Sequence, residues 1–468
     1  MTTQKSLYSN RLLPTSNGEK AVAEQLYALV KDLPIISPHG HVDPKLLRDN
    51  APFSNPAELF LYFDHYITRL LHADGISLDL VRAPSQPSDE HARNAWRIFC
   101  SRWHLLAGTS SGYWFAHSLE SIFGIALEPT AENADSLYDQ ISAVLLDPSF
   151  RPRQLFQDFK IDFLATTDDP ADSLEHHIAL NDDSSFSGRV APTFRPDFYI
   201  APDAENWLQR VEQICSMTAQ PVSHAGLVEA LWRRRQFFKA NGCVSVDIGA
   251  QSAFTTILSD AEAQRIFESA LTGNLNPEDA VRYRGHMITE MVRMSCEDGL
   301  VITLHVGVYR NHSPQTLAAF GRDTGHDIPI QAEFTLSLKP LLDAYGLNPN
   351  LHLILFSLDE TTWSREVAPL AGFYPSVFIG APWWFLDAPD AATRFREAVT
   401  ESAGFYRGSG FIDDTRAFLS IPARHDMARR VDSAFLSRLV NQGRITMEMA
   451  EKIAVDLVTA IPSRAFKL

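Results

Sequence analysis

The sequence predicts an α/β fold, a (β/α)₈ barrel of the TIM type with a large helical insertion after its first strand. Three observations support this prediction. Eight short apolar or β-branched segments, each followed by turn residues, occur along the 468-residue chain, as is typical of buried parallel strands. Helical patterns separate most of them, and eight alternating units favour closure into a barrel. The one long gap lies between the first two segments, at 42–161.

Each predicted strand is a short apolar run that ends in polar or turn residues. In chain order the eight runs are PIISPHGH (34–41), DFLATTDD (162–169), APTFRPD (191–197), GCVSVDIG (242–249), LVITLHVGV (300–308), LHLILFSLD (351–359), SVFIGAPWW (376–384) and GSGFIDDTR (408–416). In barrel enzymes the reactive side chains come from such strand ends and the loops that follow them.

The helical patterns between the strands are clearest in two places. Residues 204–218 carry apolar side chains at helical spacing, and residues 277–299 begin at Pro277 and end at Gly299, as helices often do.

The gap at 42–161 is too long for one crossover connection. Because it contains helical patterns at 56–75 and 135–147, we expect a mostly helical insertion on the barrel top rather than an independent domain. Residues 423–468 are predicted to form C-terminal helices, which completes a single barrel domain over 1–468.

The composition narrows the range of partners. With 41 basic and 57 acidic residues, the chain has a formal net charge of −16, which disfavours nucleic acid and anionic membranes as partners. The four cysteines are widely spaced and the N-terminal MTTQKSLYSNRLLPTS has no apolar core of a signal peptide. We therefore expect a cytoplasmic protein with a small-molecule substrate, without a membrane span, and a homo-oligomer as is common for barrels of this size.

A metal site is predicted where the first and last strands meet. His39 and His41 are two residues apart at a strand end, so both imidazoles can face one ion. Two such histidines are often only strand-end residues, and the pair alone is weak evidence. In a closed barrel, however, the first and last strands are neighbours, so Asp414 can complete a His-His-Asp site.

Other strand-end side chains suggest an anionic sugar as the substrate. Arginines hold carboxylates in a bidentate geometry, and Arg195, Arg310 beside Asn311, and Arg416 follow predicted strands. Any one of them is more often a solvated surface residue. The indoles of Trp383 and Trp384 can wall a sugar pocket, although packing at the barrel end explains them equally well. His65 and Tyr66 can move protons between sugar oxygens, but taken alone they fit an ordinary amphipathic helix better.

A wider set of motifs resembles the uronate isomerase family of the amidohydrolase superfamily. The set covers nearly the whole chain in order and consists of SPHGHVDP (37–44), FDHY (63–66), GCVSVD (242–247), LHVGVYRN (304–311), RDTG (322–325), APWWFLD (381–387), DDTRAFLS (413–420) and RHDMARR (424–430). The resemblance implies interconversion of D-glucuronate with D-fructuronate and of D-galacturonate with D-tagaturonate. It also implies one divalent metal ion, with Zn²⁺ expected.

The resemblance assigns roles to individual residues. It makes His39, His41 and Asp414 the metal ligands and His65 with Tyr66 a catalytic pair. It places the family's strand-eight arginine on Arg416, with a part in catalysis, and its FRPD arginine on Arg195. We expect Arg195, joined by Arg310 or Arg416, to hold the substrate carboxylate. The full set of expected substrate contacts is Arg195, Arg310, Asn311, Trp383, Trp384 and Arg424. The chain departs from the common family pattern at Ile248, where many members have His, and at Gly40, where many have Cys.

The implied mechanism is proton transfer through an enediol. Asp414 is the leading candidate for the base that moves a proton between C2 and C1. Tyr66, helped by His65, moves a proton between the oxygens on C1 and C2. Two alternatives remain open. One is a mononuclear metal-dependent hydrolase acting on a sugar acid or lactone, for which His305 would be an added ligand. The other is a non-catalytic sugar-acid binding protein.

Overall fold

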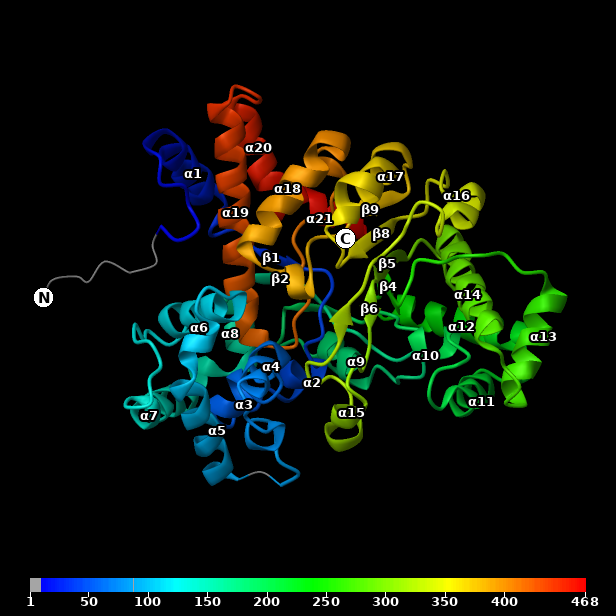
Figure 1. Cartoon of the computed structure of the whole chain (residues 1–468), viewed down its shortest axis with the longest axis horizontal. Coiled ribbons are helices and arrows are strands. Elements are labelled where there is room, and N and C mark those ends of the chain that lie inside the picture. The colour runs from blue at the N-terminus through cyan, green and yellow to red at the C-terminus, as the bar shows by residue number, and fades with distance from the viewer. Residues whose placement is uncertain (1–9, 87) are drawn as a thin grey trace, which may run out of the picture.

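The computed structural model describes residues 10–86 and 88–468 and has a mixed α/β architecture built around two parallel sheets (Figure 1). Residues 1–9, part of the segment where no signal peptide is predicted, lie outside the described residues. One sheet has the order β1-β2-β3 and the other β4-β5-β8-β9, and all neighbours within them are parallel. The strands are β1 (Ile35–Ser37), β2 (Ile161–Ala165), β3 (Arg189–Ala191), β4 (Ser245–Ala250), β5 (Val301–Val306), β8 (Leu353–Ser357) and β9 (Val377–Ile379).

Single backbone contacts connect the edges of the two sheets. Phe194, just beyond β3, bridges in parallel to Val246 of β4, and the amide of Phe194 donates to the Ser245 carbonyl at 3.1 Å. At the other edge, the Ser409 amide donates to the Ile379 carbonyl at 2.8 Å, and the His41 amide donates to the Thr415 carbonyl at 2.9 Å. The segment after β9 therefore lies between β9 and the end of β1.

The eighth predicted strand, 408–416, differs from the prediction. This fully described segment makes one parallel bridge, at Gly408, and otherwise has no strand structure. Gly410 and Asp414 have φ angles of +75° and +41°, values that a pleated strand cannot contain. The predicted parallel α/β architecture is thus confirmed. The described residues form two parallel sheets, of three and of four strands, and the closed eight-stranded barrel is not confirmed.

The helices predicted within 42–161 are present between β1 and β2. They are α2 (Pro44–Asp49), α3 (Pro56–Phe60), α4 (His65–Ala73), α5 (Asp89–Ser101), α6 (Ser110–Ser121), α7 (Ala134–Leu145) and α8 (Pro152–Asp158). The single helical pattern at 56–75 is divided in two because Asp64 starts a new helix, its side chain accepting hydrogen bonds from the Tyr66 and Ile67 amides. An aromatic core that includes Trp96, Phe99 and Phe115 holds these helices together.

The other predicted helices are also present. Residues 204–218 contain α11 (Trp207–Met217), and α14 (Pro277–Asp298) ends at Gly299, whose φ is +80°. The C-terminal helices are α19 (Ile421–Asn441), α20 (Met447–Val458) and α21 (Ala460–Phe466). The remaining helices are α1 (Asn17–Val30), α9 (Glu175–Asp182), α10 (Asp197–Ile200), α12 (His224–Ala240), α13 (Asp260–Leu271), α15 (Pro314–Phe320), α16 (Lys339–Tyr345), α17 (Ala368–Phe373) and α18 (Pro389–Ala403).

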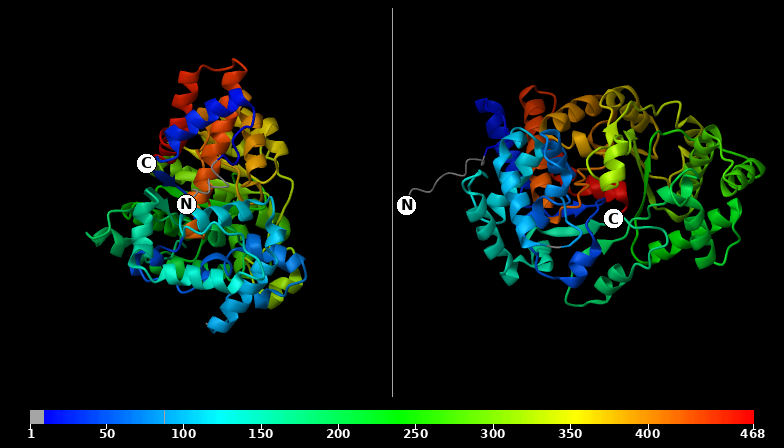
Figure 2. Two further views of the ribbon diagram at one scale, coloured as in Figure 1. Left: turned by 90° about the vertical axis from the view of Figure 1, so that its left-hand side faces the viewer. Right: turned by 60° about the horizontal axis from the view of Figure 1, so that its bottom comes forward.

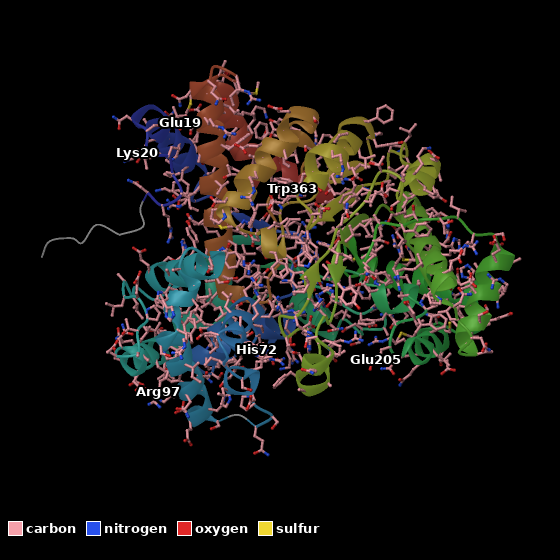
Figure 3. All side chains as sticks on the ribbon, viewed as in Figure 1. Glu19, Lys20, His72, Arg97, Glu205 and Trp363 are labelled. Atoms are coloured by element: carbon pink, nitrogen blue, oxygen red, sulfur yellow. The ribbon has the colours of Figure 1, made fainter. Side chains whose placement is uncertain are left out.

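Helices lie on several sides of the strands, and two groups of them lie opposite each other. Figures 1 and 2 show α5–α8, in cyan, on the side opposite α11–α14, in green. Side chains fill the space between the ribbons (Figure 3), and Trp363 is buried in the largest apolar cluster. No helix in the described part of the chain combines the length and apolar character needed to cross a bilayer.

Candidate active site

A cavity of about 770 Å³ opens where the parallel strands end. Such a position is where barrel-type α/β enzymes place their chemistry. Every side chain that the sequence singles out for the site lines this one cavity: His39, His41, His65, Tyr66, Arg195, Arg310, Asn311, Trp383, Trp384, Asp414, Arg416 and Arg424. The structure thus brings together residues from both ends of the chain and from the helical insertion.

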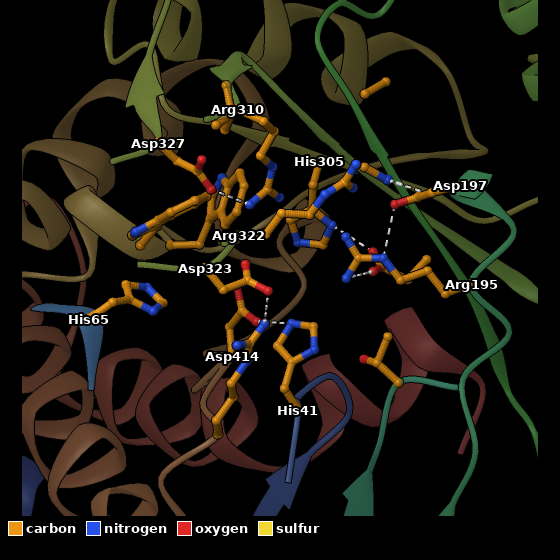
Figure 4. A pocket seen from close by; sticks show the side chains of 18 of the residues that line it. His41, His65, Arg195, Asp197, His305, Arg310, Arg322, Asp323, Asp327 and Asp414 are labelled. Atoms are coloured by element: carbon orange, nitrogen blue, oxygen red, sulfur yellow. Dashed lines mark hydrogen bonds and ion pairs between the residues drawn. The ribbon is translucent and has the colours of Figure 1, made fainter. Parts of the chain in front are cut away.

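Three of these side chains converge at the predicted metal site. Asp414 Oδ1 lies 3.0 Å from Nε2 of His41 and 3.4 Å from Nε2 of His39. The backbone of Asp414 is in the left-handed region at φ +41°, a costly conformation that here directs the carboxylate toward the imidazoles. Figure 4 shows His41 and Asp414 facing each other, with the interaction drawn as a dashed line.

The chemistry of this group fits a bound cation. Within the described chain, Oδ1 of Asp414 is buried and has no hydrogen-bond partner, although two imidazole nitrogens are close to it. A buried carboxylate oxygen without a hydrogen bond is costly, and a divalent ion would satisfy it together with the two imidazoles. Burial alone would raise the pKa of Asp414, but His39 and His41 hold that pKa well below its usual value.

His305 belongs to a second group beside the first. Its Nδ1 is 2.8 Å from Asp247 Oδ1, and its Nε2 is buried with no hydrogen-bond partner among the described residues. The ring stacks on His39, with centroids 4.9 Å apart. His39, Asp247 and His305 can also hold a metal ion together. His305 therefore contacts a predicted ligand without being part of the His39–His41–Asp414 group.

His65 and Tyr66 are held at the cavity by the start of α4. The N-cap Asp64 accepts a hydrogen bond from the Tyr66 amide at 2.9 Å, and the two rings stack with centroids 5.1 Å apart. Burial, and after it Arg416, lowers the pKa of His65 to about 4. Burial raises the pKa of Tyr66 above its usual value. At neutral pH the pair is therefore a neutral imidazole beside a protonated phenol.

Two of the predicted arginines are tightly paired. Arg195 donates through Nε to Asp197 at 2.9 Å and lies 3.2 Å from Asp247. Arg424 is buried and donates to Asp387 at 2.7 Å and to the Asp413 carbonyl at 3.1 Å. Arg424 thereby holds the backbone directly before Asp414.

The other two arginines lie nearer to solvent. Arg310 donates to Asp327 at 2.9 Å and lies over the Trp384 ring, with its guanidinium carbon 4.9 Å from the centroid. Arg416 is 47% exposed and approaches Asp323 at 3.4 Å. Of the four arginines, Arg416 has the longest ion-pair contact.

The indoles and Asn311 form part of the cavity wall. Trp383 packs edge-on against His305, with centroids 4.7 Å apart. Trp384 and Asn311 have φ angles of +52° and +55°. The backbone amide of Asn311 donates to the Asp327 carboxylate at 2.7 Å. Left-handed backbone at Asn311, Trp384 and Asp414, all of which line the cavity, is typical of a site shaped for a ligand.

Several acidic residues of the cavity are not among those predicted from the strand ends. Asp197 is two residues after Arg195 in the motif FRPD, and its Oδ1 accepts from the Gly249 amide at 2.9 Å. Asp323 and Asp327 come from the long connection between β5 and β8, which contains the short antiparallel strands β6 (Val308–Tyr309) and β7 (Ile328–Pro329). They face Arg416 and Arg310. The motif RDTG at 322–325 contains Asp323 and was the one available signal for that part of the cavity.

Comparisons with known proteins find similar proteins over nearly the whole chain. A family model described as glucuronate isomerase matches residues 12–465. A uronate isomerase from Xanthomonas axonopodis pv. citri (strain 306) is 48% identical over 99% of both chains. The crystal structure of glucuronate isomerase from Caulobacter crescentus is similar with a TM-score of 0.96 and 46% identity, covering 99% of this chain and 97% of that one. A uronate isomerase structure from Thermotoga maritima has a TM-score of 0.92 at 27% identity, covering 98% and 99%.

Proposed function

Because the chain belongs to the glucuronate isomerase family, we propose that this cavity interconverts D-glucuronate with D-fructuronate and D-galacturonate with D-tagaturonate by proton transfer. The chain is an enzyme that interconverts the aldose and ketose forms of uronates. One observation carries the assignment of its site: Asp414 and the His65–Tyr66 pair, far apart in sequence, line the same cavity. The names of the full-length relatives do not favour the hydrolase alternative.

His39, His41 and Asp414 would hold one divalent ion. Their donor set, two imidazoles and one carboxylate with positions left open for substrate, suits Zn²⁺. Such an ion supplies Lewis-acid polarisation of substrate oxygens and stabilises negative charge that develops on them. The remaining work falls to side chains of the chain itself.

Asp414 is positioned to move the carbon-bound proton. Its low pKa keeps it ionised at neutral pH, so it can accept the C2 proton of the open-chain aldose and return it to C1. Both close imidazole contacts involve Oδ1, and we assign the proton to Oδ2. This proposal requires the substrate chain to lie with C1 and C2 toward Asp414.

Tyr66, with His65 beside it, transfers protons at O1 and O2 while Asp414 moves the carbon-bound proton. The Tyr66 hydroxyl donates its proton to O1 as the C2 proton leaves, which gives the enediol, and it regains a proton from O2 as the C2 carbonyl forms. His65, neutral and 5.1 Å away between ring centroids, supports the phenol through this cycle. Two neutral groups suit this task, because no charge has to be buried before the reaction begins.

The substrate carboxylate needs an arginine whose present partner can be exchanged. Arg416 meets this condition best, because it is half-exposed and its contact with Asp323 is long. Arg310 and Asn311 would bind the sugar hydroxyls or share the carboxylate, and Trp383 and Trp384 would cover the apolar face of the chain. Arg195 and Arg424, which are already paired with buried carboxylates, would act mainly by orienting Asp247 and the backbone before Asp414.

We also propose a cytoplasmic location and a homo-oligomeric state for the enzyme. The four cysteines are free, which agrees with a reducing cytoplasm, and a homo-oligomer is proposed because barrels of this size commonly associate. Light scattering of the purified protein tests the oligomeric state.

The decisive experiment is turnover of both uronates by metal-stripped and metal-reconstituted protein in deuterated solvent. We expect activity to return with one equivalent of a divalent ion, and deuterium to appear at C1 of the ketose. Loss of all uronate turnover in the fully loaded protein would contradict the assigned reaction. Complete retention of the substrate hydrogen would argue for direct hydride transfer, unless the base is shielded from solvent.

A further inference from the structure

Trp114 is a buried tryptophan that lies beside the site without lining its cavity. It belongs to α6 of the helical insertion and is 3% exposed. Its indole nitrogen is buried and has no hydrogen-bond partner among the described residues. The guanidinium carbon of Arg424 lies over the indole ring, 3.7 Å from its centroid. Trp114 therefore reaches the site through Arg424, which does line the cavity.

Arg424 connects Trp114 to the Tyr66 ring. Its guanidinium carbon is 5.7 Å from the Tyr66 centroid, and the two aromatic rings meet edge-to-face with centroids 5.9 Å apart. Nη1 of Arg424 donates to Asp387 at 2.7 Å and to the Asp413 carbonyl at 3.1 Å. Oxygens thus hold the guanidinium from one side, and both rings lie within the distance over which an aromatic face attracts a cation.

The proposed function creates a transient negative charge at Tyr66. The hydroxyl gives its proton to O1 while Asp414 takes the C2 proton. The phenolate that remains then takes the proton of O2 while Asp414 returns its proton to C1, so that the enzyme ends the cycle unchanged. A buried phenolate is costly unless a positive charge faces it.

Arg424 is the positive charge that best meets this need. After burial, it has the largest effect on the pKa of Tyr66, and it favours the phenolate. The charges that oppose ionisation of Tyr66 belong to carboxylates: Asp387, Asp414 and Asp64. His65, which stacks on the Tyr66 ring, is neutral at neutral pH. Stabilisation of the phenolate by the described side chains therefore depends mainly on the guanidinium of Arg424.

We propose that Trp114 is a positioning residue for the Tyr66 proton shuttle: it holds the Arg424 guanidinium, shielded from water, beside the phenolate that forms during the reaction. The proposal rests on the proposed function, because it requires Tyr66 to exchange its proton. A cation over an indole is bound more strongly when water is excluded, and a charge acts more strongly on its neighbours there. Without the indole, water can approach the guanidinium and weaken its effect on Tyr66.

A purely structural role is the alternative for Trp114. The indole also packs against Ala423 and Met427 of α19, and packing alone can account for a buried aromatic side chain. A buried indole N–H usually finds an acceptor, so packing alone would be served better by phenylalanine. The guanidinium gives a reason for an indole at this position, because tryptophan is the strongest aromatic partner of a cation.

The test compares Trp114→Leu with Trp114→Phe, because neither change leaves the buried Arg424 or Asp387 without its partner. Phenylalanine keeps an aromatic face toward the guanidinium, and leucine does not. Steady-state kinetics on both uronates are measured with metal-loaded enzyme. We expect Trp114→Leu to lower kcat by about 10- to 30-fold with KM within about twofold of wild type. Trp114→Phe should lower kcat by no more than about threefold.

A double-mutant cycle with Tyr66→Phe separates positioning from packing. Without the Tyr66 hydroxyl no phenolate forms, so Trp114→Leu should leave the residual kcat of that background unchanged. In a second readout, 3-fluorotyrosine replaces Tyr66. Its phenol is more acidic and needs less help from a positive charge, so it should restore part of the kcat that Trp114→Leu loses. A loss of packing would not respond to the acidity of this phenol.

Trp103→Leu is the matched control. Trp103 packs against Phe99 and Phe115 in the same insertion, with centroids 5.8 and 5.2 Å apart, and does not line the cavity. Its replacement should lower the free energy of unfolding, measured in urea, and leave kcat unchanged. Trp114→Met, which also lacks an aromatic face, replaces Trp114→Leu if the leucine variant does not fold.

The outcomes distinguish the positioning role from the proposed function. The positioning role of Trp114 alone is refuted if Tyr66→Phe is impaired while Trp114→Leu keeps kcat within about twofold of wild type. It is refuted equally if Trp114→Leu lowers kcat by the same factor in the Tyr66→Phe background. A Tyr66→Phe enzyme with the kcat of wild type would instead refute the shuttle itself, and with it the positioning role.

Discussion

Replacing Tyr66 by phenylalanine isolates the proposed proton shuttle. The ring contacts, to His65 at 5.1 Å and to Trp114 at 5.9 Å between centroids, remain after the change. The Tyr66 hydroxyl makes no hydrogen bond to any described residue, so none is lost. We therefore expect the free energy of unfolding to change by less than about 0.5 kcal/mol. Loss of a positioned acid–base group should lower kcat by about 10²–10⁴-fold, or roughly 3–5 kcal/mol in the barrier.

Tyr62→Phe, in the same part of the chain, is the matched control, because it should affect stability and not kcat. Tyr62 is buried, lies outside the cavity, and its hydroxyl hydrogen-bonds to Nδ1 of His91 at 2.9 Å. Tyr62→Phe should cost about 1 kcal/mol of stability and leave kcat unchanged. Urea unfolding and steady-state kinetics on both uronates measure the two effects. A Tyr66→Phe enzyme that is fully folded and retains kcat within tenfold of wild type would refute the shuttle.

Three further predictions address the metal, the pH dependence and the scaffold. His41→Asn should reduce the bound metal, measured by atomic emission after dialysis, because one of three ligands is lost; retention of a full equivalent would contradict the assignment. The His65 imidazole should titrate near pH 4 by NMR, since its pKa is lowered to about 4. The stability that neutral His65 contributes should be complete above about pH 6.5 and be lost as the pH falls toward 4, whereas a midpoint near 6.5 would refute the burial argument. Asp298→Asn should destabilise the fold by about 3–5 kcal/mol without changing the kcat of folded enzyme, because Asp298 pairs with the fully buried Arg235 at 2.8 Å, and a loss under 1 kcal/mol in urea unfolding would contradict this.

The sequence was sufficient to predict that His39, His41 and Asp414 lie together, because this prediction depends on few assumptions. His39 and His41 have the alternation of a strand, and parallel strands bring their carboxyl ends to one edge. The prediction for Asp414 also required that the first and last segments be adjacent. The hydrogen bond from the His41 backbone amide to the Thr415 carbonyl agrees with this adjacency. Local spacing and general topology were sufficient for this part of the cavity.

The backbone of the last segment could not be predicted in the same way. The run GSGFIDDTR contains hydrophobic residues between turn residues and resembles a strand, but Gly410 and Asp414 adopt positive φ. The left-handed conformation of Asp414 is stabilised by contacts from elsewhere, such as the Arg424 bond to the Asp413 carbonyl. Long-range contacts of this kind override local propensity.

The partners of the arginines were also beyond sequence reasoning. Arg424 and Asp387 are 37 positions apart, and Asp323 reaches Arg416 from a connection that folds back as β6 and β7. Neither strand of that pair was predicted, because two-residue strands carry no periodic signal. A sequence shows which side chains can bind an anion, but not which of them already have a carboxylate beside them.

The charges of the cavity explain how an acidic enzyme can accept an anionic substrate. Its lining contains seven carboxylates and six guanidinium groups, so with neutral histidines it is close to charge balance, at 6 − 7 = −1: Asp64, Asp197, Asp203, Asp247, Asp323, Asp327 and Asp414 against Arg195, Arg284, Arg310, Arg322, Arg416 and Arg424. A divalent ion at the His39–His41–Asp414 group would bring the balance to −1 + 2 = +1. Attraction of a uronate then depends on the ion rather than on an open patch of positive charge. An open patch would bind any anion, whereas this arrangement favours a ligand that can place its oxygens at the ion.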